Sequence, residues 1–170
     1  MAGTVIVITG GVRSGKSRRA EERVKAFPGR PVHIATAEAG DDEMRRRIAL
    51  HRERRGAEWI GHEVPLDLAR ILVETDGAGP RLVDCLTLWL SNLLHSDRDW
   101  KLEVATLTRT LSDQRSPVVL VTNEVGLGIV PDNALARAFR DAAGVMNSSV
   151  AAVADEVEFI VSGLVLKLKG

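Results

Sequence analysis

Gly10-Gly11-Val12-Arg13-Ser14-Gly15-Lys16-Ser17 is the stretch that decides the fold of this chain of 170 residues. It matches the pattern G-x-x-x-x-G-K-[ST] in full, and the apolar, β-branched run Val5 to Thr9 precedes it directly. A charged, helix-favouring segment from Lys16 to Ala26 follows, so the match lies between a predicted strand and a predicted helix. The glycines allow consecutive backbone amides to converge on phosphate oxygens, and the positive end of the helix dipole faces the same anion. The alternative is a glycine-rich turn that matches by chance, which the flanking strand and helix argue against.

Short apolar runs alternate with amphipathic stretches along the rest of the chain. This alternation predicts an α/β fold with a mostly parallel sheet and helices on both faces. The last run alternates leucine with lysine, so we expect an antiparallel C-terminal edge. The predicted strands are Val5 to Thr9, Val32 to Ala35, Glu58 to His62, Arg81 to Asp84, Val118 to Thr122, Val157 to Ser162 and Leu164 to Lys169. The predicted helices are Lys16 to Ala26, Asp41 to Arg54, one that begins near Pro65, Leu86 to His95, Asp99 to Leu111 and a long one whose apolar stripe runs from Leu135 to Val153, with Gly144 outside that stripe.

Composition and charge restrict the class of protein. The 23 Lys and Arg residues balance 23 Asp and Glu residues, so the chain has no broad positive field for nucleic acid or acidic membranes. A hydrophobic content of 45% and the length of the chain predict one domain over residues 1–170 with its own core. No apolar run approaches the roughly 20 residues that span a bilayer, so we expect no membrane insertion. The single cysteine, Cys85, cannot form an internal disulfide, and the N-terminus lacks a signal-peptide pattern, so the expected location is cytoplasmic.

Two side chains suit a magnesium ion that binds together with a nucleotide. The Ser17 hydroxyl closes the phosphate motif, and Asp84 ends an apolar strand at the sheet edge where ligands bind. Asp84 could instead cap the helix that begins at Leu86, and one aspartate could do both. Glu124, which follows the strand Val118 to Thr122, is a further candidate of the same type. Lys16 is expected to place its charge at the β- and γ-phosphates.

The helix predicted from Asp41 to Arg54 carries a histidine among several arginines. His51 shares a face with Met44 and Ile48, and an isolated histidine on an apolar face is most often a hydrogen-bonded core residue. A second interpretation follows from the phosphate loop elsewhere in the same small domain. Imidazole can attack a nucleotide α-phosphorus, with pyrophosphate leaving and nearby guanidinium groups stabilising the departing charge. The residue pattern alone leaves both roles of His51 open.

Several segments together carry a more specific signature than the phosphate loop. They are Gly10 to Ser17, Ile34 to Thr36, Asp41 to Arg45 with Arg47, Ile48 and His51, Glu63 to Leu68, Val83 to Trp89, Thr122 to Pro131 and Val161 to Gly163. In this order they resemble the bifunctional adenosylcobinamide kinase / adenosylcobinamide-phosphate guanylyltransferase family of cobalamin biosynthesis. The stretch Asn-Glu-Val-Gly-Leu-Gly-Ile-Val-Pro at 123–131 and the histidine helix are the most specific matches.

The resemblance implies a P-loop fold similar to RecA and two reactions. A nucleoside triphosphate, ATP or GTP, phosphorylates the aminopropanol hydroxyl of adenosylcobinamide, and GMP then passes from GTP to adenosylcobinamide phosphate with release of pyrophosphate. The resemblance also implies a covalent GMP-histidine intermediate, which would form on His51. The expected partners are therefore GTP, ATP, adenosylcobinamide and its phosphate, and further copies of the chain in a homo-trimer. Mg²⁺ is the expected cofactor, and no nucleic acid is expected.

The implied functional residues fall on matching positions of this sequence. The catalytic residues are Lys16 and His51, and the metal ligands are Ser17 and Asp84. Glu63 suits guanine because its carboxylate can accept the N1–H and N2–H groups together, although an exposed charge beside a strand is the alternative. The implied nucleotide contacts are Gly10, Gly11, Val12, Arg13, Ser14, Gly15, Lys16, Ser17, Ala35, Thr36, Ala37, Arg52, Glu53, Arg54, Arg55, Glu63 and Asp84.

Two other functions are compatible with the residues. One is a simple P-loop kinase for a small molecule, in which His51 only positions the substrate. The other is a non-catalytic nucleotide-dependent assembly module. A regulatory GTPase is disfavoured because the chain lacks the N-K-x-D guanine signature.

Overall fold

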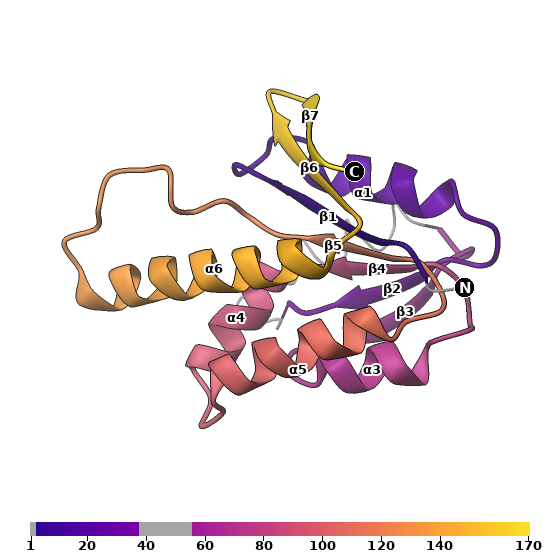
Figure 1. Ribbon diagram of the computed structural model, residues 1–170, viewed down its shortest axis with the longest axis horizontal. Helices are drawn as coiled ribbons and strands as arrows, with labels where there is room; N and C mark the ends of the chain where they lie inside the picture. Colours follow the sequence, from indigo (N-terminus) through magenta and orange to yellow (C-terminus); the bar gives the residue numbers. More distant parts are fainter. Residues whose placement is uncertain (1–2, 38–55) are drawn as a thin grey trace.

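The computed structural model describes residues 3–37 and 56–170. Its centre is a seven-stranded sheet with the strand order β3-β2-β4-β5-β1-β6-β7 (Figure 1). Neighbouring strands from β3 to β6 pair in parallel, whereas β7 runs antiparallel to β6. The strands are β1 (Val5–Gly10), β2 (Val32–Ala35), β3 (Ile60–Glu63), β4 (Arg81–Asp84), β5 (Val118–Val121), β6 (Glu156–Val161) and β7 (Leu164–Lys169).

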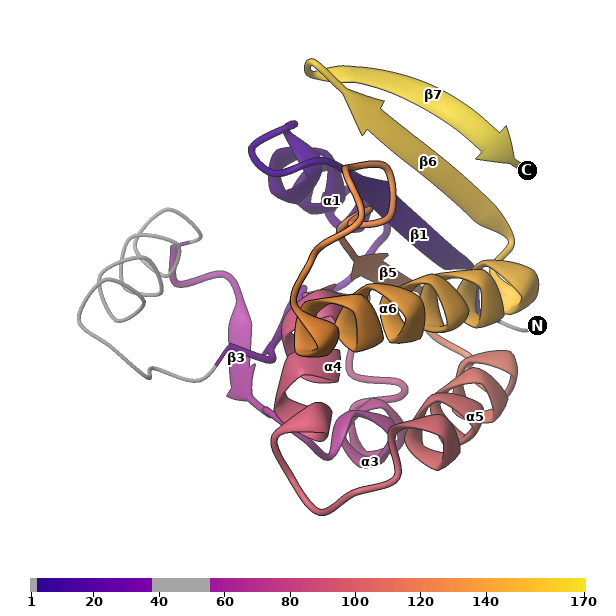
Figure 2. The same cartoon turned by 90° about the vertical axis from the view of Figure 1, so that its left-hand side faces the viewer.

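Helices cover both faces of the sheet. One face carries α1, and the other carries α3, α4, α5 and α6 (Figures 1 and 2). Their bounds are α1 (Lys16–Lys25), α3 (Leu68–Glu74), α4 (Leu86–Leu94), α5 (Trp100–Ser112) and α6 (Ala134–Val153). The predicted α/β architecture, with a mostly parallel sheet and an antiparallel C-terminal edge, is confirmed. Among the helices of the described residues, none combines the length and apolar character that crossing a membrane requires.

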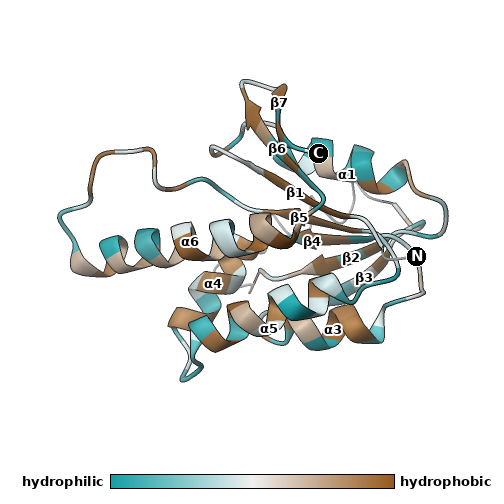
Figure 3. Cartoon of the chain, viewed as in Figure 1, coloured by the Kyte–Doolittle hydropathy of each residue, from teal (hydrophilic) through white to brown (hydrophobic). Residues whose placement is uncertain are grey.

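The strand β1 is apolar on both faces because a hydrophobic core lies on each side of it. Ile6 and Ile8 belong to the buried cluster beneath α1, whereas Val5 and Val7 belong to the larger cluster beneath α3 to α6. All four side chains are at most 3% exposed. Hydrophobic residues accordingly concentrate in the central strands (Figure 3). Burial from both sides makes the sheet a rigid platform for the loops at its carboxyl edge.

The structure shifts some of the predicted bounds. The helix expected near Pro65 begins at Leu68, and the edge strand covers Ile60–Glu63 rather than Glu58 to His62. Gly144 lies within α6 without breaking it, as predicted. Leu135 is 64% exposed despite its place in the apolar stripe, because the first turns of α6 extend beyond the sheet (Figure 1). The helix predicted from Asp41 to Arg54 lies outside the described residues.

The turn after β1 rests against β6 and the β6–β7 turn. Gly10 has a φ of +146°, and a Cβ atom at this position would lie 2.4 Å from the carbonyl oxygen of Ile160. The backbone N–H of Gly163 donates to the carbonyl oxygen of Ser14 at 3.0 Å. The hairpin formed by β6 and β7 therefore supports the phosphate motif on the side of β1 that faces away from β5.

An ion-pair network ties α1 to β6. The Glu158 side chain is 3% exposed and accepts two hydrogen bonds of 2.7 Å from Arg19. Arg23 donates to Glu158 at 3.1 Å and to Glu156 at 2.8 Å. The hydrogen bonds from Arg19 are the largest cause that holds the pKa of Glu158 below its ordinary value. Because α1 begins inside the phosphate motif, this network also fixes the direction in which the helix N-terminus points.

Replacing Glu158 should weaken the fold and flatten its dependence on pH. Glu158→Gln leaves two arginines without their buried partner, so we expect a loss of about 3 kcal/mol in the free energy of unfolding at pH 7. A carboxyl group whose pKa is depressed by folding stabilises the native state above its unfolded pKa, about 4.3, and loses that contribution as the pH falls through its folded pKa. The wild-type protein should therefore lose stability below about pH 5 more steeply than Glu158→Gln.

Urea unfolding from pH 7 to pH 3 measures this effect. Glu22→Gln is the matched control, because Glu22 pairs with Arg18 and Arg19 while 55% of its side chain stays exposed. An exposed pair of this kind contributes at most about 1 kcal/mol. Equal losses in the two variants would show that the buried network is not the stabilising element.

Adding a methyl group at Gly10 should also destabilise the protein. In Gly10→Ala the new Cβ meets the Ile160 carbonyl and the backbone keeps a disfavoured φ, so we expect a loss of about 2 kcal/mol or more. Gly11→Ala is the control, because among the described residues no heavy atom beyond its two chain neighbours lies within 4 Å of its added Cβ. Chemical denaturation followed by circular dichroism should separate the two variants clearly. Similar denaturation midpoints for Gly10→Ala and Gly11→Ala would mean that the phosphate loop does not rest on β6.

Candidate active site

The phosphate motif forms a turn between β1 and α1. Gly15 precedes the first turn of α1 with a φ of +105°, and Arg13 adopts a φ of +56° in the middle of the loop. The first backbone N–H groups of a helix have no partner inside it, so those of α1 are available at this turn. Ser14 adds a buried hydroxyl oxygen that has no hydrogen-bond partner within residues 3–37 and 56–170. The turn therefore offers several donors in one concave place, which suits a phosphate.

Lys16 lies within the loop that it is expected to serve. Its ammonium group donates to the carbonyl oxygen of Gly11, and the residue is 7% exposed. Burial lowers the pKa of Lys16, while the neighbouring Cys85 and Asp84 raise it. Lys16 interacts electrostatically with Asp84, because the start of α1 lies near the end of β4. Two residues that are distant in the sequence, and that were both predicted to be functional, thus share one site.

Asp84 and Ser17 fit a magnesium ion that is held partly by the nucleotide. Mg²⁺ prefers hard oxygen ligands and is usually bound through one or two protein groups together with substrate phosphates. A carboxylate and a hydroxyl next to a phosphate loop provide this donor set. Among the residues that the structure describes, no group of three or more His, Cys, Asp and Glu side chains forms a separate metal centre. The residues present therefore suit a cation that arrives with its nucleotide.

Thr36 holds the segment that carries Asp84. Its backbone N–H donates to the carbonyl oxygen of Asp84 at 3.1 Å, and its hydroxyl donates to the carbonyl oxygen of Cys85 at 2.7 Å. The same hydroxyl oxygen accepts from the Cys85 N–H at 2.9 Å, and the Thr36 carbonyl accepts from Asn92 at 2.8 Å. Burial raises the pKa of the Cys85 thiol to about 11. Among the implied nucleotide contacts, Thr36 thus has a clear structural task, and Cys85 is a neutral core residue.

Glu63 lies on the same edge but further along it. In the parallel register Ala35 pairs with both Glu63 and Asp84, so the ends of β3, β2 and β4 are level with one another. The strands β2, β4 and β5 separate Glu63 from the strand that leads into the phosphate loop. The predicted nucleotide contacts therefore spread along the sheet edge, with the phosphate loop at one end and Glu63 at the other.

A polar network at the ends of β4 and β5 was not predicted from the sequence. The Thr122 hydroxyl donates to Asn147 at 2.7 Å and lies 3.3 Å from the Thr87 hydroxyl, which accepts the Asn123 N–H at 2.8 Å. The Glu124 N–H then donates to the carbonyl oxygen of Gly10 at 3.1 Å. The position of Thr87 and Asn123 in the sequence could have indicated this network, because each residue follows a strand that ends at the ligand-binding edge of the sheet. The network fixes the start of the loop at 123–133 beside the phosphate motif.

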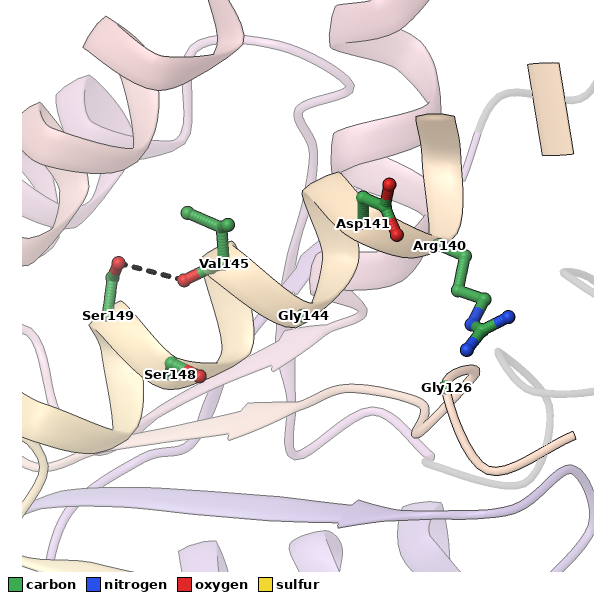
Figure 4. A pocket seen from close by; sticks show the side chains of 7 residues that line it. All are labelled: Gly126, Arg140, Asp141, Gly144, Val145, Ser148 and Ser149. Atoms are coloured by element: carbon green, nitrogen blue, oxygen red, sulfur yellow. Dashed lines mark hydrogen bonds between the residues drawn. The ribbon is translucent and has the colours of Figure 1, made fainter. Parts of the chain in front are cut away.

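A groove of about 520 Å³ runs between this loop and α6. Figure 4 shows Arg140 reaching from α6 toward Gly126 of the loop. Its lining residues are Gly126, Arg140, Asp141, Gly144, Val145, Ser148 and Ser149. The groove is connected to the site because the carboxylate of Glu124 accepts the Gly126 N–H at 2.7 Å.

The predicted nucleophile and its neighbours lie outside the described residues. These are His51, Arg52, Glu53, Arg54 and Arg55. Two histidines of the described residues have structural surroundings that account for them. His33 lies buried in β2 with its ring edge-on to Trp59, and the exposed His95 lies at the end of α4, 2.7 Å from the carbonyl oxygen of Ser91.

Solved structures show the same fold at low sequence identity. The P4 protein from bacteriophage phi6 in complex with ADP matches with a TM-score of 0.50 and 18% identity over 96% of this chain and 52% of that chain. A prototypical ATPase from the type III secretion system of pathogenic bacteria matches with a TM-score of 0.56 and 13% identity over 98% and 57%. This chain thus spans about half the length of these two proteins. The likeness confirms the expected P-loop fold.

Sequence relatives are much closer. The bifunctional adenosylcobalamin biosynthesis protein CobP of Pseudomonas aeruginosa is 49% identical over 168 residues, and the match covers 96% of both chains. The CobU proteins of Salmonella typhimurium and Escherichia coli, which bear the same description, are 42% and 39% identical over 97% of this chain and 99% of theirs. The family model for cobinamide kinase / cobinamide phosphate guanyltransferase, CobU, matches residues 6–168. A match over nearly the full length, by the model and by all three relatives, shows that the chain belongs to this family of bifunctional enzymes.

Proposed function

We propose that this chain phosphorylates adenosylcobinamide with a nucleoside triphosphate and then transfers GMP from GTP to adenosylcobinamide phosphate. The product is adenosylcobinamide-GDP, and pyrophosphate is released in the second reaction. The observation that carries this proposal is the complete phosphate motif, folded as a strand-turn-helix with Lys16 beside Asp84, in a chain of this family. A simple kinase would catalyse only the first reaction, and a non-catalytic nucleotide-dependent module would catalyse neither.

The phosphate loop holds the nucleotide in this proposal. The backbone N–H groups at the start of α1 and the Ser14 hydroxyl bind phosphate oxygens, and Lys16 and Arg13 neutralise their charge. A Mg²⁺ ion would be held by Ser17 and Asp84 and would neutralise phosphate charge in the transition state. Asp84 keeps its place because the hydrogen bonds of Thr36 to the Asp84 and Cys85 backbone fix the end of β4.

His51 is the nucleophile of the guanylyl transfer in this proposal. Its ring nitrogen attacks the α-phosphorus of GTP, a nitrogen–phosphorus bond forms, and pyrophosphate leaves with the electrons of the broken bond. Arg52, Arg54 and Arg55 are close enough in sequence to stabilise the departing charge. The GMP then passes to the phosphate of the corrinoid substrate, which frees His51. An imidazolium has no lone pair for this attack, so guanylyl transfer should fall at acid pH.

Glu63 selects guanine over adenine in this proposal. A carboxylate can accept two parallel hydrogen bonds from the N1–H and N2–H edge of guanine, and adenine cannot offer that pair. Its place at the end of β3 supports this role, because the base of a nucleotide must lie away from the phosphate loop.

The hairpin of β6 and β7 supports the proposal of a trimer. The edge strand β7 exposes Leu164, Leu166 and Leu168 by 74%, 56% and 59%. An exposed apolar edge strand is an aggregation hazard unless another chain or element covers it. Contact with further copies of this chain would cover it.

His51→Ala should separate the two reactions. Incubation with GTP labelled at the α-phosphate should give acid-labile label on the wild-type protein and none on His51→Ala, because only the imidazole carries the GMP. The variant should still phosphorylate adenosylcobinamide. His95→Ala is the matched control, since this exposed histidine lies at the end of α4, and it should label normally. Normal labelling of His51→Ala would refute the assignment of the nucleophile.

Leu166→Lys should shift the protein from trimer toward monomer. A charge in the centre of a buried interface costs several kcal/mol of association, whereas the same change on an exposed surface costs little. Leu102→Lys on α5 is the control, because Leu102 is 61% exposed and far from the hairpin in the chain. Size-exclusion chromatography with light scattering measures the mass of each variant. A monomeric wild-type protein, or a trimeric Leu166→Lys, would contradict the proposal.

A further inference from the structure

The two reactions make different demands on a base, and this inference rests on the proposed function. The acceptor of the kinase reaction is an alcohol, whose oxygen must lose a proton when it bonds to phosphorus. The acceptor of the guanylyl transfer is a phosphate monoester, whose second pKa is about 6, so it is already an anion at neutral pH. A general base is therefore needed in the first reaction and is dispensable in the second.

Three carboxylates in the described residues lie at the carboxyl ends of the strands from β3 to β1. Asp84 interacts with Lys16 and suits the metal ion, so its charge is committed to the phosphates. Glu63 follows β3, and three strands separate it from the phosphate loop. Glu124 follows β5, which pairs directly with β1. Position on the sheet thus singles out Glu124 for the acceptor side of the site.

Glu124 is anchored to the phosphate loop by its own backbone. Its N–H donates to the carbonyl oxygen of Gly10, the residue that begins the loop, at 3.1 Å. The preceding residue, Asn123, is held through its N–H by the Thr87 hydroxyl, and its carbonyl oxygen accepts from Asn147 at 3.2 Å. A catalytic group requires this kind of rigid support, because errors of position of about 1 Å are costly to the rate.

The carboxylate of Glu124 is oriented and still has acceptor positions open to a substrate. One oxygen, Oε1, accepts the Gly126 N–H at 2.7 Å. Within residues 3–37 and 56–170 this is the hydrogen bond that the carboxylate makes, and a carboxylate has about four acceptor positions on two oxygens. The side chain is half-buried beside the groove that Gly126 lines. It can therefore meet a substrate without leaving its place in the loop.

We propose that Glu124 is the general base of the kinase reaction. The hydroxyl oxygen of the acceptor attacks the γ-phosphorus, and the new oxygen–phosphorus bond forms while the bond to the β–γ bridging oxygen breaks. The nucleoside diphosphate leaves with that electron pair, and the hydroxyl proton passes to the Glu124 carboxylate. The guanylyl transfer makes no use of this proton transfer.

Glu124→Gln tests the proposal, because the amide oxygen can still accept the Gly126 N–H while the basic oxygen is lost. Phosphorylation of adenosylcobinamide from γ-labelled triphosphate should fall about 10²-fold or more in kcat. Guanylyl transfer to supplied adenosylcobinamide phosphate should stay within about threefold of wild type. Glu124→Asp, which keeps a base at a shorter reach, should recover part of the kinase rate.

Asp132→Asn is the matched control, since it removes the same charge from an exposed position of the same loop and should leave both rates unchanged. Thermal stabilisation by Mg-nucleotide shows that each variant folds and binds. Unchanged kinase activity in Glu124→Gln would overturn the proposal, and so would an equal fall of both reactions. If the wild-type protein itself catalyses neither reaction, the proposed function has failed, which is a different result from a loss confined to the variant.

Discussion

Backbone hydrogen bonds hold β1 between β5 and β6, and the positions of the surrounding groups depend on this pairing. On one side, Gly10 approaches the carbonyl of Ile160, and the Gly163 N–H binds Ser14. On the other side, the Glu124 N–H binds the carbonyl oxygen of Gly10. The phosphate loop is therefore fixed from both flanks before any ligand arrives. Preorganised amide groups stabilise anionic charge without a cost of reorganisation at the moment of reaction, which is why a strongly paired strand precedes the loop.

The positive potential of the site comes from nearby groups, because the chain as a whole carries no net positive charge. Equal numbers of acidic and basic residues leave no net charge. The two arginines of α1 that face β6 add little positive potential to the site, because Glu158 and Glu156 neutralise their charge. Arg19 is bound to Glu158, and Arg23 is bound to both carboxylates. Within the described part of the chain, the phosphate loop therefore relies on helix amides and on the charges of Lys16 and Arg13.

The sequence allowed the elements to be predicted where local patterns determine them. The strand bounds of β2, β4 and β7 match the prediction, because each apolar or alternating run begins directly after a proline or a glycine. Periodicity alone did not reveal that α6 extends past the sheet, so the exposure of Leu135 was missed. The hydrogen bonds of Thr36 to Cys85 and the network of Thr87, Thr122 and Asn147 join residues that are distant in the sequence. Such pairings follow from the strand order, which the residue pattern does not specify.

The strand order also explains how one edge of the sheet can separate phosphate binding from base recognition. The strands β3, β2, β4, β5 and β1 are in parallel register, and at roughly 4.8 Å per strand the end of β3 lies about 19 Å from the end of β1. The amides of the phosphate loop bind any triphosphate, because they contact only oxygens that all nucleotides share. In the proposed function, discrimination between bases comes from Glu63 at the other end of this span. If Glu63 selects the base as proposed, a substitution at the end of β3 would change nucleotide preference without disturbing the loop that binds the phosphates, because three strands separate the two.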